Sequence, residues 1–215
     1  AEGRFLVAAS LTGLVESEGA ARLTAVEKGD RWVLSGNLPL VADVDIADCL
    51  LVHARVRGSD EVAPFLVPKG QAGIITEDVV GLDRSRSFAR VVFEEVSVAP
   101  DLLLARGQAA RESLAQAVRV ATVALCSTMV GGAQAAMEMA VDYANTRQQF
   151  GSYIGRFQAI KHRCADMLVL LEGAKTATYY AAWAVGTGQP EAEAAVSLAK
   201  QYASEVYTQI ATDCI

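Results

Sequence analysis

The feature that most constrains this 215-residue chain is a long helical period that begins after Pro100. Apolar residues recur along it at intervals of three or four: Leu114, Val118, Ala121, Leu125 and Met129. Helix-compatible sequence continues to about Arg147, which predicts a rod of about 60 Å at about 1.5 Å per residue. A helix of this length needs other long helices to cover its apolar side, so a bundle is expected.

Two further helices are predicted after it. The second begins near Phe157 and ends before the Gly- and Pro-containing loop 186–190. Its expected apolar face is Phe157, Ile160, Cys164, Leu168 and Leu171. The third runs from about Glu191 past Ile210, and it reaches Ile215 with no Gly, Asn or Pro to end it. We therefore expect a longer protein, in which at least one more helix completes the antiparallel bundle.

The first hundred residues have the shorter period of strands. Segment 21–36 alternates apolar and polar residues on both sides of Lys28-Gly29-Asp30, which is a hairpin signal. Further strand-like segments follow at short intervals: 48–56, 61–70, 72–80 and 88–100. The predicted fold class is therefore α+β, with an antiparallel β-barrel or sandwich domain over residues 1–101 followed by an antiparallel long-helix bundle over residues 102–215.

Composition excludes several classes of function. A formal net charge of −6 and a pI near 5.0 give no support to nucleic-acid binding, which requires a basic surface. The cysteines are far apart and form no C-x-x-C pair, so neither a metal site nor a disulfide framework is predicted: Cys49, Cys126, Cys164 and Cys214. The default localisation is a reducing cytoplasm.

Segment Val120–Met137 has no charged residue and is long enough to span a membrane. It is rich in Ala, Gly, Ser and Thr and includes Gln134, with Arg119 and Glu138 at its edges. This composition favours a helix buried among helices over one that faces lipid, so no membrane span is predicted.

The stretch between Tyr143 and Ala165 contains no acidic residue, although the chain as a whole is acidic. Its basic residues are Arg147, Arg156, Lys161 and Arg163. Such a stretch indicates an anionic ligand, an acidic partner or a solvated surface.

This stretch also carries a motif that resembles the signature of the acyl-CoA dehydrogenase family. The matching residues occur in the family's order and spacing: Tyr143, Arg147, Gln149-Phe150-Gly151, Ile154, Phe157-Gln158 and Ala165-Asp166-Met167. Weaker agreement extends through residues 32–52 and 91–100, so the resemblance covers nearly the whole chain. The family's N-terminal helical domain and the last part of its C-terminal bundle have no counterpart in it.

The resemblance implies an enzyme family that binds FAD and oxidises the Cα–Cβ bond of an acyl-CoA thioester. A carboxylate removes the α proton, and the flavin takes the β hydride. The family's flavin lies at a subunit interface, which implies a homo- or hetero-tetramer of related subunits. Electrons are expected to leave through an electron-transfer flavoprotein.

Carried over residue by residue, the motif implies one side of an FAD site. Arg147 would pair with the pyrophosphate, because a guanidinium matches phosphate oxygens. Gln149 and Phe150 would line the adenosine side, and Gly151 would permit close approach of the backbone. Phe157-Gln158 would contact the ribose and adenine. The alternative for Arg147 is that it only caps the C-terminus of a helix.

The rest of the basic stretch is given no ligand. Lys161 and Arg163 are expected to form a solvated helix face, and His162 is assigned no role.

The sequence departs from the family on the side that faces the flavin ring. Leu40, Val41 and Ala42 stand where the family has an aromatic residue, an Ile and a Thr or Ser that hydrogen-bonds the flavin. Ala42 cannot make that bond. The family's loop around flavin and substrate is reduced, and only Ser10 and Thr12 could supply hydroxyl groups.

No catalytic residue is predicted. In some branches of the family the catalytic Glu lies on the first long helix, at the position of Ala121, and an Arg often follows where this chain has Thr122. Arg119 could be a displaced remnant of that Arg, although a surface arginine is the commoner explanation. Other branches place the Glu after the third helix, beyond Ile215.

The residues that would contact a neighbour's flavin are present, whereas those that would contact the chain's own flavin are absent. Three interpretations follow from this asymmetry. The first is a half-site or non-catalytic subunit that contributes to an FAD held mainly by a partner. The second is an ordinary homo-oligomeric acyl-CoA dehydrogenase whose Glu lies outside the given segment. The third is a flavin-free structural paralogue.

Overall fold

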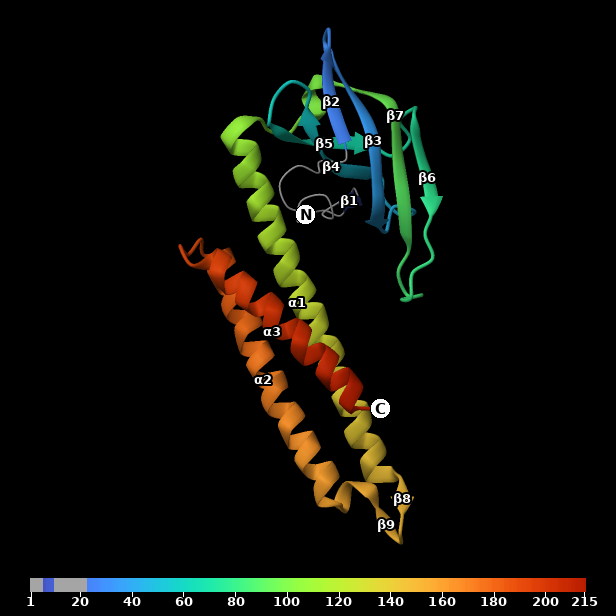
Figure 1. Cartoon of the computed structure of the whole chain (residues 1–215), viewed down its shortest axis with the longest axis vertical. Helices are drawn as coiled ribbons and strands as arrows, with labels where there is room; N and C mark the ends of the chain where they lie inside the picture. The colour runs from blue at the N-terminus through green and yellow to red at the C-terminus, as the bar shows by residue number, and fades with distance from the viewer. Residues whose placement is uncertain (1–5, 10–22) are drawn as a thin grey trace. The chain divides into compact units, whose positions relative to one another are not determined.

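The computed structural model describes residues 6–9 and 23–215 of the chain (Figure 1). It divides into two compact units, and the division falls between Val118 and Arg119, inside one long helix.

The first unit is built on a seven-stranded sheet. Its strands are β1 (Val7–Ala9), β2 (Leu23–Lys28), β3 (Arg31–Ala42), β4 (Cys49–Val56), β5 (Val62–Pro68), β6 (Ile74–Asp78) and β7 (Phe88–Val98). They lie in the order β1-β4-β2-β3-β7-β6, and β5 pairs with β4. The predicted hairpin is present, because β2 and β3 pair antiparallel around Lys28 and Arg31.

The α+β fold class is confirmed, but the sheet is mixed and not purely antiparallel. Strand β4 runs parallel to β1 and to β2, whereas the remaining pairs in this sheet are antiparallel. The prediction missed this because turn residues reveal which consecutive strands form hairpins. They carry no information about pairing between strands that are not consecutive.

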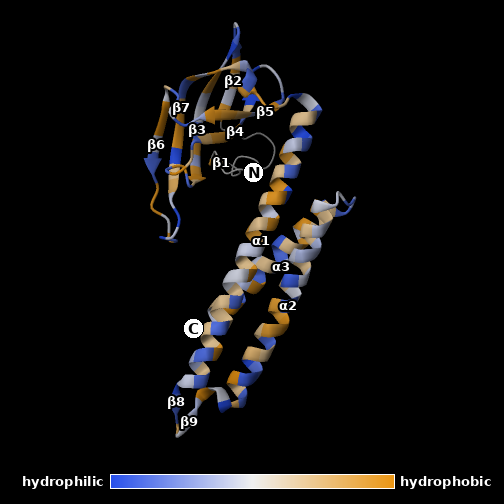
Figure 2. Cartoon of the chain, turned by 180° about the vertical axis from the view of Figure 1, so that it is seen from behind, coloured by the Kyte–Doolittle hydropathy of each residue, from blue (hydrophilic) through white to orange (hydrophobic). Residues whose placement is uncertain are grey.

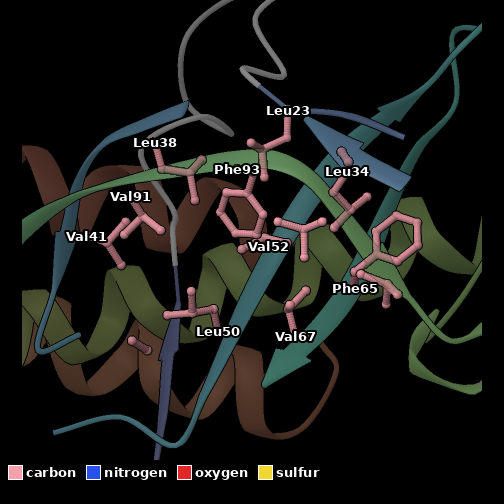
Figure 3. Packing of buried hydrophobic residues seen from close by; sticks show 14 of the residues in the cluster. Leu23, Leu34, Leu38, Val41, Leu50, Val52, Phe65, Val67, Val91 and Phe93 are labelled. Atoms are coloured by element: carbon pink, nitrogen blue, oxygen red, sulfur yellow. The ribbon is translucent and has the colours of Figure 1, made fainter. Parts of the chain in front are cut away.

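The core of this unit lies on one side of the strands (Figure 3). Alternate residues of β2, β3, β4 and β7 point into it, as the period of two requires. Its largest fully buried members are Phe65, Phe93, Leu23, Leu34 and Leu50. The ring of Trp32 packs edge-on against Phe65 at a centroid distance of 5.6 Å.

A carboxylate fixes the start of the long helix α1 (Gly107–Thr146). Glu61 accepts a hydrogen bond of 2.7 Å from the Gly107 amide, and the Arg106 guanidinium lies 3.4 Å from the same carboxylate. The Gly107 amide, followed by Arg106, holds the pKa of Glu61 below its usual range. An anion beside the first amides of a helix is favourable, so Glu61 ties the helix to the strand region that precedes it.

The second unit contains the rest of α1 with α2 (Gln158–Gly186) and α3 (Ala192–Asp213). Two apolar clusters join the three helices: one around Cys126, Ala181 and Ala199, the other around Ala133, Met167 and Ile210. The three predicted helices are therefore present. Three positions of the predicted apolar faces are wrong, because Leu125 is 46%, Phe157 38% and Leu168 46% exposed. On α2, Met167 is buried in place of its neighbour Leu168.

Helix α1 is long and apolar enough to cross a membrane, judged by length and composition only. Its most apolar window is 6% buried within the described residues, so the predicted burial among helices is not met inside this chain. The physical reason is that α2 and α3 cover one side of α1 and leave its other sides open. Membrane insertion and oligomer contacts are both compatible with such a helix.

His53 is an isolated polar group in the sheet. It lies on β4, is 7% exposed, and its Nδ1 has no hydrogen-bond partner in the described part of the chain. Burial lowers the pKa of His53 from 6.5 to about 4, because the charged imidazolium is costly to desolvate. The folded protein therefore holds this histidine neutral.

This burial predicts a pH dependence of stability. The folded-state pKa lies below the unfolded value, so the unfolded chain binds the proton first, and stability falls as the pH drops from 6.5 towards 4. The His53 contribution to this loss is about 3 kcal/mol, since one pKa unit corresponds to about 1.4 kcal/mol.

The His53→Gln variant should lose this component of the pH dependence, and His162→Gln, at an exposed histidine, should keep it. Urea unfolding measured at several pH values between 7 and 4 checks this difference. Equal slopes for wild type and His53→Gln would contradict the assignment.

Candidate functional site

The predicted site residues fall on a small hairpin between α1 and α2. Its strands are β8 (Gln148–Gln149) and β9 (Ser152–Tyr153), and Gln149 pairs with Ser152. The turn residues are Phe150 and Gly151, with φ values of +53° and +73°. Two consecutive positive φ values define a tight two-residue turn that suits the twist of the strands.

The hairpin is anchored at its base to the end of α1. The Arg147 amide donates to the Tyr143 carbonyl at 2.8 Å, and the Arg147 carbonyl accepts from the Ile154 amide at 2.9 Å. Gly155 then passes so close to α1 that a Cβ there would lie 2.9 Å from the Ala144 carbonyl oxygen. The chain can make this approach because residue 155 has no side chain.

Two phenylalanine rings lie on this segment. Phe150 is 93% exposed at the tip of the turn, and Phe157 is 38% exposed just before α2. Their ring centroids are 6.2 Å apart and their planes are inclined at 76°. A phenylalanine in the left-handed region is uncommon and costs conformational energy. The backbone therefore holds a large apolar side chain in solvent, where no hydrophobic burial offsets the cost of the strained conformation.

The segment is also electropositive. Within the described residues, no acidic side chain forms an ion pair with Arg147, Arg156 or Lys161. Arg163 differs from the predicted solvated face, because it binds Asp213 of α3 at 2.7 Å. Arg147 directly follows Thr146, the last residue of α1, which is the place where a cation interacts favourably with a helix C-terminus, so the structure is compatible with the capping alternative as well.

The start of α2 adds free amide donors. Its N-cap residue is Phe157, which makes no side-chain capping bond, and its first turn contains no acidic residue. Gln158 is the first residue of the helix and is exposed. An uncapped helix N-terminus favours an anionic group.

The structure thus brings the six predicted residues onto one exposed segment: Arg147, Gln149, Phe150, Gly151, Phe157 and Gln158. It offers a free guanidinium, an exposed aromatic ring, a turn with open space around Gly151, and helix amides without a cap. These groups fit the charged and planar parts of an ADP-containing cofactor.

The side predicted to face the flavin ring fits poorly. Leu40 and Val41 are apolar, and Val41 is 2% exposed in the core. Ala42 ends β3 opposite Phe88 and carries only a methyl group. At these three positions the strand therefore offers a flavin no side-chain hydrogen bond. Ser10 and Thr12 lie outside the described residues.

The α1 positions at which the family resemblance places a catalytic base or its neighbouring arginine carry no carboxylate. Ala121 and Thr122 are half-buried, and Arg119 and Thr122 each make interactions within the structure. No group of three or more His, Cys, Asp or Glu side chains in residues 6–9 and 23–215 could hold a metal ion.

Sequence reasoning missed the hairpin and the close approach at Gly155. A Phe-Gly pair is not a usual signal for a two-residue turn, which favours Asn-Gly or Asp-Gly. Gly155 stands in a Tyr-Ile-Gly-Arg sequence that is equally compatible with a loop. The only available signal for a turn or a close backbone approach was the presence of two glycines, Gly151 and Gly155, in a short segment between two helices.

The left-handed turn predicts that alanine substitution lowers stability at Gly151 but not at Gly186, although both glycines have open space around them. A Cβ at Gly151 or at Gly186 would meet nothing within 4 Å, but Gly151 has a φ of +73°. Gly151→Ala should therefore lower the free energy of unfolding by about 1 kcal/mol through backbone strain alone. Gly186→Ala should cause no comparable loss.

Urea denaturation followed by circular dichroism compares the two variants. If Gly151→Ala is as stable as Gly186→Ala, the left-handed turn at residues 150–151 is wrong.

Comparison with known proteins identifies the family. Residues 108–215 match the family model described as acyl-CoA dehydrogenase, C-terminal domain. The bovine (Bos taurus) mitochondrial short-chain specific acyl-CoA dehydrogenase is 34% identical over 198 residues, which is 89% of this chain and 48% of that protein. The chain spans about half the length of such relatives.

Solved structures agree with this match over both units. An FAD-dependent dehydrogenase aligns with a TM-score of 0.85 at 31% identity, covering 97% of this chain and 58% of that chain. A chain of the ChsE4-ChsE5 complex from Mycobacterium tuberculosis aligns with a TM-score of 0.82 at 25% identity, covering 98% of this chain and 55% of that chain. As its motif predicts, the chain belongs to the acyl-CoA dehydrogenase family.

Proposed function

We propose that this chain is a half-site subunit of a flavoprotein that dehydrogenates an acyl-CoA thioester. In this proposal it contributes the hairpin residues Arg147, Gln149 and Phe150, with Gln158, to an FAD held mainly by a related partner subunit. The observation that carries the proposal is the exposed hairpin at the end of α1. Its tip residue Phe150 is held in solvent by a left-handed turn, and Arg147 forms no ion pair within the described residues.

The asymmetry between the two sides of the site supports a shared location. The residues that would serve a neighbour's cofactor are present and accessible on the hairpin. The residues that would serve a flavin bound by this chain's own strand β3 lack hydrogen-bonding side chains at Leu40, Val41 and Ala42. We therefore expect this chain to contribute to an FAD site on a partner subunit more effectively than it binds FAD on its own β3 strand.

In this proposal Arg147, Phe150 and Gly151 have separate tasks, Gln149 lines the adenosine side with Phe150, and Gln158 contacts the ribose and adenine. Arg147 neutralises and orients the pyrophosphate through paired N–H donors. Phe150 shields the adenosine side from water, and Gly151 lets the backbone approach without a side chain in the way. The amides at the start of α2 favour the same negative charge. FAD, when bound, supplies the two-electron redox chemistry.

The assignment of partner and compartment is part of the same proposal. The structure of a ChsE4-ChsE5 complex supports a pairing with a second kind of chain, because one chain of that complex aligns with both units of this one. We place the chain in the cytoplasm, as one kind of subunit in a tetramer, with an electron-transfer flavoprotein as the electron acceptor.

A second candidate is an ordinary homo-oligomeric acyl-CoA dehydrogenase with a carboxylate base outside the given segment. Similarity to the short-chain enzyme over 89% of this chain favours it. The two candidates differ in whether the chain forms a complete flavin site with copies of itself.

The proposed role of Arg147 predicts that replacing it weakens FAD binding. The chain is co-expressed with candidate partner chains, and the purified complex is titrated with FAD after the flavin has been removed. Arg147→Ala should weaken FAD binding by about 10- to 100-fold, since a charge-assisted hydrogen bond contributes about 1.5–3 kcal/mol. Flavin fluorescence quenching measures the dissociation constant.

Arg156→Ala is the matched control, because Arg156 is an exposed arginine on the same segment and has no predicted contact with FAD. It should change the dissociation constant by less than about threefold, the scatter of surface charge effects. A complex in which Arg147→Ala binds FAD as tightly as wild type would contradict the proposed site. A complex without flavin in wild type and variant alike would indicate a structural paralogue.

A further inference from the structure

Two of the four cysteines meet in one pocket of the second, helical unit. Cys164 and Cys214 are free thiols that lie far apart in sequence, so their spacing gives no sign of a pair. Both side chains line a pocket of about 760 Å³ that the end of α1, the start of α2 and the end of α3 enclose. In Figure 2 the label C marks the end of α3, beside α1 and above the β8–β9 hairpin.

Two contacts set the position of Cys214 on α2. Asp213, one residue before it, binds Arg163 at 2.7 Å, and Arg163 directly precedes Cys164. The Cys214 thiol itself donates to the sulfur of Met167 at 3.8 Å. Met167 stands three residues after Cys164, so the two side chains lie on one face of α2. Cys214 therefore lies over the turn of α2 that carries Cys164.

The two thiols are close enough for the charge of one to act on the other. Burial, followed by the charges of Cys164 and Asp213, raises the pKa of the Cys214 thiol above its ordinary value. The thiol is the poor nucleophile and the thiolate the good one, so Cys214 reacts slowly with an oxidant at neutral pH. Both cysteines are half-buried beside the open pocket, which gives a small molecule access to them.

The position of Cys214 at a helix end permits the movement that a disulfide needs. A disulfide requires Cα atoms within about 7 Å of each other. Cys214 follows Asp213, the last residue of α3, and its amide makes the final hydrogen bond of the helix, to the Ile210 carbonyl at 3.0 Å. Its backbone can therefore shift towards α2 without disturbing the earlier turns of α3.

The other two cysteines lack this arrangement. Cys126 is fully buried in the apolar cluster around Ala181 and Ala199, and Cys49 lies on strand β4 of the first unit. Neither of them is among the residues that line the pocket. A buried thiol in apolar surroundings is inert, whereas two thiols that share a pocket can react with each other.

We propose that Cys164 and Cys214 form a redox modification site, at which a hydroperoxide converts the two thiols into a disulfide between α2 and the end of α3. With hydrogen peroxide, the Cys164 sulfur first attacks the O–O bond, takes one oxygen as a sulfenic acid, and one water leaves. The Cys214 sulfur then attacks the sulfenic sulfur, so the S–S bond forms and a second water leaves. The two sulfurs lose two electrons, and the peroxide gains them. The proposal does not rest on the proposed flavin site.

Peptide mapping of the wild-type protein tests the pair directly. The full chain, alone or with its co-expressed partner, is treated with hydrogen peroxide, unfolded, alkylated at the remaining thiols and digested. The mass of the chain should fall by about 2 Da before alkylation, since a disulfide has two hydrogens fewer than two thiols. Two of the four thiols should escape alkylation, and one linked peptide pair should contain Cys164 and Cys214.

Dithiothreitol should restore both thiols. A linked pair that contains Cys49 or Cys126, or a chain that keeps four free thiols after treatment, would overturn the inference. The outcome does not depend on the FAD content of the sample, which separates this inference from the proposed function.

Cysteine variants test the order of the two steps. In Cys214→Ser the sulfenic acid on Cys164 has no partner thiol, so dimedone should label residue 164 at least about tenfold more than in wild type. Cys164→Ser should form no disulfide and should take little dimedone at residue 214. Cys49→Ser is the control and should form the disulfide as wild type does. Equal labelling of residue 164 in wild type and Cys214→Ser would contradict the assigned roles.

Thermal melting followed by circular dichroism measures the effect of the bond on the fold. A disulfide between residues 164 and 214 restricts the unfolded chain, so the oxidised wild type should melt at least about 4 °C above the reduced protein. Cys164→Ser should melt at the same temperature with and without peroxide. A cross-linked wild type that melts no higher than the reduced protein would show that the native fold does not accommodate the bond.

Discussion

Three helices cannot cover one another's apolar sides, and this constraint governs the helical unit. Each helix in such a set buries the strip that faces its two neighbours and leaves the rest to other parts of an assembly. The consequence is visible on α1, whose most apolar window is 6% buried, and on α2, whose outer side carries Tyr179 and Trp183. The exposed apolar area is therefore contact surface that the described residues do not cover.

Apolar packing does not explain the conformation of the hairpin between α1 and α2. Phe150 is held in a left-handed turn and remains 93% exposed, so local stability does not explain its position. A strained backbone that presents an aromatic ring and an unpaired guanidinium is typical of a binding element. Strand β3 offers only apolar side chains at Leu40–Ala42, and this contrast with the hairpin is the basis of the proposal that the chain serves a neighbour's cofactor.

The sequence predicted the elements better than their pairing. The long periods of α1, α2 and α3 were clear because helix contacts are local, and the β2–β3 hairpin was clear because its turn is short. The parallel contacts of β4 with β1 and β2 were missed, since non-consecutive pairing leaves no local signal. On the candidate site, the motif predicted Arg147 and Phe150, and the structure places both on one exposed hairpin. The positive φ values and the approach of Gly155 to Ala144 depend on backbone geometry that residue types do not reveal.

In the proposed complex this chain supplies one side of an FAD site and needs a partner for the other. The ratio of flavin to polypeptide in purified protein tests it most directly, with chains counted by amino-acid analysis and FAD by absorbance after release. A complex of this chain with its partner should contain one FAD for every two chains, and this chain purified alone should be colourless. A stoichiometric yellow complex of one FAD with each copy of the lone polypeptide would contradict the account.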